Sequence, residues 1–129
     1  CQEVLAKGLA DMGVLTVSAE ESLKPEVGLH RRWTLHGVSH HLGLDVHDCA
    51  QARKEMYLDA PLREGMVLTV EPGLYIQPDD ELFAPEYRGI GIRIEDDVVV
   101  TADGCRNLSE DIPRHPDDIE KWMKSVLGR

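Results

Sequence analysis

The stretch EGMVLTVEPGLYI, residues 64–76, decides the fold that the sequence predicts. Apolar side chains at every second position, Met66, Leu68 and Val70, predict a strand with one buried face. The pair Pro72-Gly73 breaks this pattern before a second short apolar run begins. We therefore expect two short strands separated by a turn.

The stretch YRGIGIRIEDDVVVT, residues 87–101, repeats the period of two. Isoleucines occupy every second position of its central part: Ile90, Ile92 and Ile94. We expect these isoleucines to face the core, and Arg93 and Glu95 to share the opposite face of the strand. The β-branched run at 98–101 and the Asp103-Gly104 turn predict a further strand and a hairpin.

Helical patterns flank these strands at both ends of the chain. The opening segment has apolar residues at helical spacing before a stop at Gly13, namely Val4, Leu5, Leu9 and Met12. Ser18 and Glu21 form a capping box, which predicts a short second helix. A last helix begins at Pro116 and ends before Gly128, and we expect its apolar face to pack on an apolar surface: Ile119, Trp122, Met123, Val126 and Leu127. Strands between helices predict an α+β fold with a mostly antiparallel sheet.

The composition limits the partners of the protein. The 129 residues carry 14 Lys and Arg against 24 Asp and Glu, a formal net charge of −10. Binding to a phosphate backbone comes from clustered Lys and Arg, so we expect no nucleic-acid partner. No apolar run approaches the roughly 20 residues that cross a bilayer, so we expect no membrane partner. Three widely spaced cysteines without a C-x-x-C pair favour a reducing compartment, and we expect the cytoplasm.

The stretch HGVSHHLGLDVHD, residues 36–48, holds four of the six histidines. Neutral imidazole is the commonest metal ligand and a common proton carrier near neutral pH, which makes His36, His40 and His47 candidates for either task. No Glu follows His36 or His40 to give a zinc-binding H-E-x-x-H motif, and Ser39 lies outside a G-x-S-x-G motif. The other histidines have no neighbours that suggest a ligand set, and we expect ordinary structural roles for them: His30, His41 and His115.

Two carboxylates lie among the aliphatic residues of the strand patterns. Glu71 directly precedes the Pro-Gly turn, and Glu95 follows the last isoleucine of the alternation. A carboxylate in such a place is costly unless it is paired or bound to a metal. An ion pair between Arg93 and Glu95 is one interpretation. The other is a divalent-metal site built from the histidine-rich segment and both carboxylates, with Mn, Zn, Co or Fe as candidate ions.

The three quoted segments together resemble the Xaa-Pro aminopeptidases (aminopeptidase P). This family belongs to the pita-bread metallopeptidases, alongside prolidase and methionine aminopeptidase. The segments occur in the family's order with similar gaps, and the resemblance covers roughly residues 1–127. It implies the C-terminal half of a pita-bread fold, the creatinase/aminopeptidase-like α+β fold. The amino-acid sequence of residues 44–48, LDVHD, favours the proline-directed members over methionine aminopeptidase.

The resemblance also implies a metal centre. The family holds two divalent ions, usually Mn, with two Asp, one His and two Glu. Carried over by motif, His40 corresponds to the His ligand, Glu71 to the first Glu and Glu95 to the bridging Glu. The two Asp ligands have no counterpart in this sequence, which has only Asp11 upstream of His40. We therefore expect residues 1–129 to be the C-terminal portion of the catalytic domain, without its upstream half and its N-terminal domain.

Catalytic roles follow from the same resemblance. It implies that His36 and His47 position the substrate carbonyl and carry protons, and that Arg93 orients the substrate and holds the bridging carboxylate. A hydroxide that bridges the two metals would attack the scissile carbonyl, with Glu71 as general base and later as general acid. His41 stands where aminopeptidases P often carry an aromatic residue.

The predicted function is removal of an N-terminal residue that precedes proline, with peptides that carry proline at the second position as substrates. We expect the isolated chain to be inactive, because it supplies three of five ligands, and to form homo-oligomers through uncovered apolar faces. The alternatives are prolidase, a non-catalytic pita-bread relative that binds peptide or protein, and metal-free chemistry of the creatinase kind. Retention of all three ligand types argues against the last two.

Overall fold

The computed structural model describes residues 1–128 and is an α+β structure in which every strand pairing is antiparallel, as the sequence predicts. Three short 3-10 helices lie in the connections, at Leu29–Arg32, Lys54–Met56 and Pro85–Tyr87. The helices and strands follow in the order α1 (Gln2–Asp11), α2 (Ala19–Ser22), β1 (Val67–Val70), β2 (Gly73–Tyr75), β3 (Gly91–Arg93), β4 (Asp96–Thr101), β5 (Gly104–Asn107) and α3 (Pro116–Leu127).

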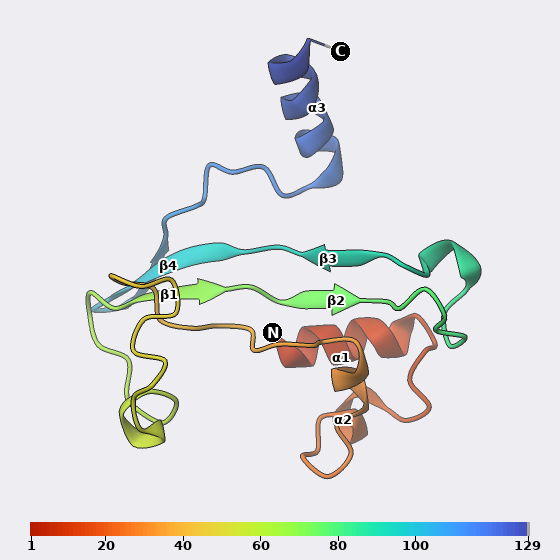
Figure 1. The fold of residues 1–129 in the computed structure, drawn as a ribbon, viewed down its shortest axis with the longest axis horizontal. Helices are drawn as coiled ribbons and strands as arrows, with labels where there is room; N and C mark the ends of the chain where they lie inside the picture. Colours follow the sequence, from red (N-terminus) through yellow and green to blue (C-terminus); the bar gives the residue numbers. More distant parts are fainter. Residues whose placement is uncertain (129) are drawn as a thin grey trace.

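Two strand pairs form one long antiparallel ribbon with a break in the middle. β1 pairs with β4, and β2 pairs with β3, so the ribbon passes from one sheet into the next (Figure 1). The register continues across the break, because Val70 lies opposite Asp96 and Gly73 lies opposite Arg93. The hydrogen-bonded ladder stops at Pro72, which has no N–H to donate.

The histidine-rich segment lies along the free edge of β1. The opposite edge of β1 is covered by β4, which also forms the predicted hairpin with β5. Residues 38–42 exchange main-chain hydrogen bonds with β1, including Thr69 N–H to the His40 carbonyl at 2.9 Å and Leu42 N–H to the Val67 carbonyl at 3.0 Å. The segment therefore acts as an irregular edge strand, and its backbone is fixed relative to β1.

A small apolar core lies between α1 and the β2 end of the ribbon. Its buried members are Leu9, Val14, Trp33, Ile76 and Phe83. The rings of Trp33 and Phe83 meet edge to face with centroids 5.4 Å apart. The predicted apolar face of α1 is only partly right: Leu9 is buried, whereas Val4 and Met12 are exposed.

His30 is an ordinary core histidine, as predicted. It is buried, its main-chain N–H donates to Ser22 Oγ at 2.9 Å, and its Nδ1 lies 3.0 Å from the Ser22 carbonyl. His115 precedes α3, and its Nδ1 accepts from the Asp117 N–H at 3.4 Å.

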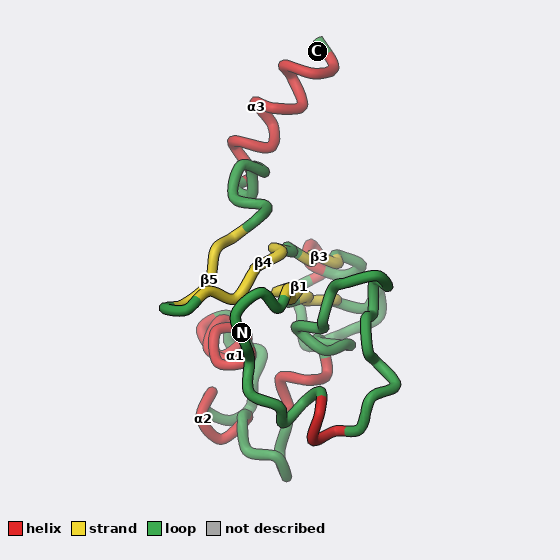
Figure 2. The backbone as a smooth tube through the Cα atoms, turned by 90° about the vertical axis from the view of Figure 1, so that its left-hand side faces the viewer, coloured by secondary structure: helices red, strands yellow, loops and turns green. Residues whose placement is uncertain are grey.

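The helix α3 has the predicted ends but not the predicted packing. It begins at Pro116, and Gly128 follows it in the left-handed conformation with φ 63°. None of its residues is buried, and the helix extends away from the rest of the chain (Figure 2). In residues 1–128, no helix combines the length and the apolar character needed to cross a membrane.

The expectation that the three isoleucines face the core is wrong for the described chain. Ile90, Ile92 and Ile94 are 40%, 56% and 46% exposed. Alternation decides which side chains share a face, but it does not decide whether another element covers that face. The opposite face carries Arg93 and Glu95 together, as expected, with 3.2 Å between Arg93 Nη2 and Glu95 Oε2.

Asp80, in the loop after β2, hydrogen-bonds with residues just before the histidine-rich segment. Its Oδ2 accepts from the Trp33 indole Nε1 at 2.6 Å and from Arg32 Nε at 3.2 Å, and its Oδ1 accepts from the Leu82 N–H at 3.1 Å. Burial alone would raise the pKa of Asp80, but these donors outweigh burial and hold the pKa below its ordinary value of 3.8.

This lowered pKa predicts acid sensitivity. The ionised Asp80 carboxylate contributes fully to the free energy of unfolding above pH 3.8. This contribution is lost as the pH falls through the lower folded-state pKa, because Asp80 binds a proton more readily in the unfolded chain. Asp80→Asn is expected to lower the free energy of unfolding at neutral pH by about 1–3 kcal/mol and to flatten its decline in acid. Urea unfolding of the full gene product at several pH values measures both effects. The exposed neighbour gives the control, Asp79→Asn, which should change neither.

Candidate metal centre

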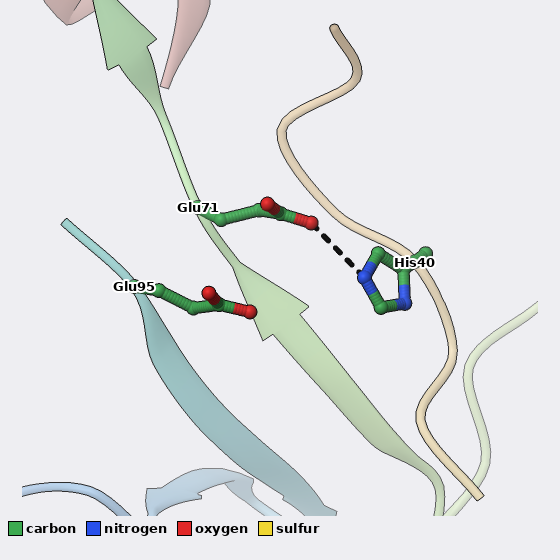
Figure 3. Close-up of side chains that lie close together, drawn as sticks. All are labelled: His40, Glu71 and Glu95. Atoms are coloured by element: carbon green, nitrogen blue, oxygen red, sulfur yellow. Dashed lines mark ion pairs between the residues drawn. The ribbon is translucent and has the colours of Figure 1, made fainter. Parts of the chain in front are cut away.

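Three side chains from distant parts of the sequence converge beside the break in the ribbon. His40, Glu71 and Glu95 each offer a ligand atom, and these atoms all lie within 4.8 Å of one another. Figure 3 shows His40 on the neighbouring segment facing Glu71, with Glu95 beside Glu71 on the adjacent chain, between β3 and β4. These are the three residues that the sequence predicts as metal ligands, and the structure brings them together.

The ribbon explains why the two carboxylates meet. The register on both sides of the break places Glu71 opposite Glu95. Like charges on directly opposed residues of an antiparallel pair are destabilising unless a cation lies next to both. Arg93 supplies one positive charge, with Nη1 3.6 Å from Glu71 Oε2 and Nη2 3.2 Å from Glu95 Oε2. One guanidinium offsets one of the two negative charges, and the remaining charge favours a bound cation.

Thr69 holds His40 and Glu71 in place. Its hydroxyl accepts from the His40 N–H at 3.1 Å and donates to Glu71 Oε1 at 3.2 Å. Thr69 is only 2% exposed, so both hydrogen bonds are protected from water. The sequence indicates that Thr69, two residues before Glu71, shares a face of the strand with it, but it predicts no role for Thr69 in the site.

The orientation of the His40 ring fits a metal ligand. Nδ1 lies 3.0 Å from the His41 carbonyl, which can only accept, so Nδ1 carries the hydrogen. In a neutral ring, Nε2 then presents its lone pair to Glu71 Oε1, 3.0 Å away. Two ligand atoms bound at a right angle about 2.1 Å from one cation are about 3 Å apart. The separation and the donor types therefore suit a divalent ion, and the Nδ1 bond holds the ring as metal-binding histidines are usually held.

His36 and His47 make different contacts, His47 with the His40 ring and His36 with Tyr75. The ring of His47 is exposed, and its centroid is 4.4 Å from that of His40. His36 forms a separate pair: its Nδ1 is 2.6 Å from the Gly37 carbonyl, and its Nε2 is 2.7 Å from the Tyr75 hydroxyl. Because the carbonyl takes the Nδ1 hydrogen, the Tyr75 hydroxyl donates to Nε2 in the neutral ring.

Tyr75 and Gly73 are site residues that sequence reasoning missed. A Cβ atom added at Gly73 would lie 2.6 Å from the Tyr75 hydroxyl and 2.8 Å from His36 Nε2. Only glycine leaves room for this pair of side chains over the backbone. The sequence shows glycine and tyrosine two residues apart on one strand, but nothing in it places His36 beside them.

The arrangement can serve hydrolysis. A set of imidazole and carboxylate ligands suits Mn, Fe, Co and Zn. A divalent ion in such a site polarises a carbonyl and lowers the pKa of a bound water. Glu71 lies against His40, and His47 lies beside the His40 ring, so both could accept or donate a proton next to such an ion.

The family model for metallopeptidase family M24 matches residues 1–102. Xaa-Pro aminopeptidase 1 of Streptomyces coelicolor is 58% identical over 127 residues, which are 98% of this chain and 26% of that protein. The structure of aminopeptidase P from E. coli with the inhibitor Pro-Leu matches with a TM-score of 0.84 and 42% identity, over 99% of this chain and 28% of that one. Zn-substituted E. coli aminopeptidase P in complex with product matches with a TM-score of 0.83 and 44% identity, over the same shares.

The chain belongs to metallopeptidase family M24, and it is a homologue of the Xaa-Pro aminopeptidases. Its α+β fold matches part of the aminopeptidase P fold. Membership of this family implies divalent metal ions. The chain spans about a quarter of the length of the relatives it matches.

The metal centre predicts a specific loss of affinity. In Glu95→Gln, the loss of one negative charge and one carboxylate ligand is expected to weaken binding of Mn²⁺ by at least about tenfold. Calorimetric titration of the chelator-treated full gene product with manganese chloride measures this. Glu86→Gln removes an exposed carboxylate elsewhere on the chain and should leave the affinity unchanged. Equal affinity in the Glu95 variant and the wild type would show that this carboxylate binds no metal.

Proposed function

We propose that residues 1–129 form part of the catalytic domain of an Xaa-Pro aminopeptidase, which removes an N-terminal residue that precedes proline. The observation that carries this proposal is the convergence of His40, Glu71 and Glu95 in a chain of family M24. The names of the matched relatives favour an aminopeptidase over a prolidase. Intact ligand residues argue against a purely binding relative and against metal-free chemistry.

In this proposal, His40, Glu71 and Glu95 would hold divalent ions, most simply Mn, together with ligands from elsewhere in the protein. Such ions, when bound, polarise the scissile carbonyl and make a water molecule acidic. Zn, Co and Fe suit the same ligands. Activity after reconstitution with each ion in turn would identify the metal, and Mn is expected to give the highest activity.

The residues of this chain then divide the proton transfers and the orientation of the substrate. Glu71 accepts the proton of the attacking water and later gives it to the leaving amine, and its Oε1 is held by Thr69 for this task. His47, whose ring lies beside that of His40, and His36, held by Tyr75, would position the substrate carbonyl and carry protons. Arg93 keeps the two carboxylates in place through its contacts with both.

The assay compares peptide substrates. The Mn-loaded full gene product should release the first residue of an X-Pro-X tripeptide and leave the corresponding X-Ala-X peptide intact. Cleavage of X-Pro dipeptides alone would indicate a prolidase instead. No cleavage of any X-Pro peptide would refute the proposal. The isolated 129-residue chain is expected to show negligible activity.

We also propose that the protein forms homo-oligomers in a reducing compartment such as the cytoplasm. Uncovered apolar side chains on α3, including Trp122 and Val126, support the first part, because exposed apolar patches mark contact surfaces. Three free and exposed cysteines support the second: Cys1, Cys49 and Cys105. Light scattering of the full gene product should give a mass of at least two chains, and a single-chain mass would contradict the proposal.

A further inference from the structure

We propose that Asp80 is a positioning residue for His36, acting through Trp33 and Tyr75. This inference rests on the proposed function, because it assigns a role within the same catalytic site. Asp80 is 3% exposed and lies outside the cluster of His40, Glu71 and Glu95. A buried carboxylate is costly, and here two of its three donors, Arg32 and Trp33, lie just before His36 in the chain.

The first step links Asp80 to the start of the histidine-rich segment. Its Oδ2 accepts from the Trp33 indole at 2.6 Å and from Arg32 Nε at 3.2 Å. The Arg32 guanidinium carbon also lies 5.8 Å from the centroid of the Trp33 ring. Trp33 is 2% exposed and precedes His36 by three residues. The Asp80 carboxylate therefore fixes the side chain of Trp33, three residues before His36.

The second step links Trp33 to strand β2. The Trp33 carbonyl accepts from the Tyr75 N–H at 2.9 Å, and β2 pairs with β3 on its other side through Tyr75 and Gly91. A shift of Trp33 therefore moves the carbonyl that accepts from the Tyr75 N–H. It also moves the chain that leads to His36. Asp80 controls the relative position of the two segments that carry His36 and Tyr75.

The third step is the side-chain pair itself. Tyr75 Oη lies 2.7 Å from His36 Nε2, and the two ring centroids are 5.5 Å apart. The backbone of Gly73 passes so close that a Cβ there would lie 2.6 Å from the Tyr75 hydroxyl. The pair therefore has little freedom to restore its hydrogen bond after a shift of either segment. Small displacements of catalytic groups are costly in rate.

A carboxylate suits this task better than its amide. Asp80 accepts hydrogen bonds at both oxygens, from Leu82 N–H at Oδ1 and from Trp33 and Arg32 at Oδ2. An asparagine has one acceptor oxygen, so it must leave one of these sides without an acceptor. Asp80→Asn keeps the size of the side chain, replaces one acceptor oxygen by an NH2 donor and removes the negative charge that faces Arg32.

A double-mutant cycle tests the route through Tyr75. In the Mn-loaded full gene product, Asp80→Asn is expected to lower kcat for an X-Pro peptide about tenfold in the wild-type background. In a Tyr75→Phe background the same substitution should lower kcat less than twofold, because the bond it acts on is already lost. Equal fold-changes in the two backgrounds would indicate general destabilisation and would overturn the inference. An unchanged kcat in Asp80→Asn would overturn it as well.

Two further variants control for folding. Asp79→Asn removes the same charge from the exposed neighbour and should leave kcat unchanged. Trp33→Phe removes the indole donor but keeps an aromatic ring against Phe83, and it should reproduce the loss and the coupling of Asp80→Asn. This second variant decides the question if Asp80→Asn does not fold.

A spectroscopic measurement separates this inference from the proposed function. The ¹⁵N chemical shift of His36 Nε2 reports the hydrogen bond from Tyr75 and needs no turnover. Asp80→Asn should move this shift toward its value in Tyr75→Phe, and Asp79→Asn should not. If the wild-type protein cleaves no X-Pro peptide, the proposed function fails, while the shift still decides the positioning role. An unchanged shift in Asp80→Asn would overturn that role.

Discussion

The pairing of Glu71 with Glu95 across an antiparallel ribbon is the constraint on which the rest of the site depends. The register that continues from β1–β4 into β2–β3 makes these two carboxylates opposite neighbours. Their mutual repulsion favours a cation close to both carboxylates. Arg93 contacts both of them, and His40 places Nε2 beside Glu71 as a further metal ligand. The ladder breaks at Pro72, which has no N–H to donate, while Glu71 N–H donates to the Val38 carbonyl of the histidine-rich segment at 2.8 Å.

The small core at the β2 end supports this arrangement from behind. Trp33 packs against Phe83 and hydrogen-bonds with Asp80, while its carbonyl accepts from Tyr75. Packing, a buried charge and a strand bond therefore converge on one residue that leads directly into the histidine-rich segment. Buried polar networks of this kind specify one geometry because each unpaired member would be costly. The precision of the His36–Tyr75 pair has its origin in this core.

The uncovered apolar residues show where local pattern stops being informative. The isoleucine alternation of β3 and the amphipathic pattern of α3 are real, and the structure has a strand and a helix at these places. Both patterns predict a buried face, yet no element of residues 1–128 covers either one. The period of a sequence determines the shape of an element and the side on which its apolar residues lie. Which residues cover that apolar side depends on parts of the protein that are distant in sequence, or on another molecule.

The sequence by itself determined the strands, the helix ends and the α+β class, because strand period and caps are local properties. The choice of His40, Glu71 and Glu95 among its histidines and carboxylates came from the resemblance of three sequence segments to a known family. Only the tertiary structure decided how these residues are held. Thr69 joins His40 to Glu71, and Tyr75 meets His36, which lies 39 positions earlier in the sequence. Such contacts depend on register and on close backbone approach, as at Gly73, and neither is written in a local pattern.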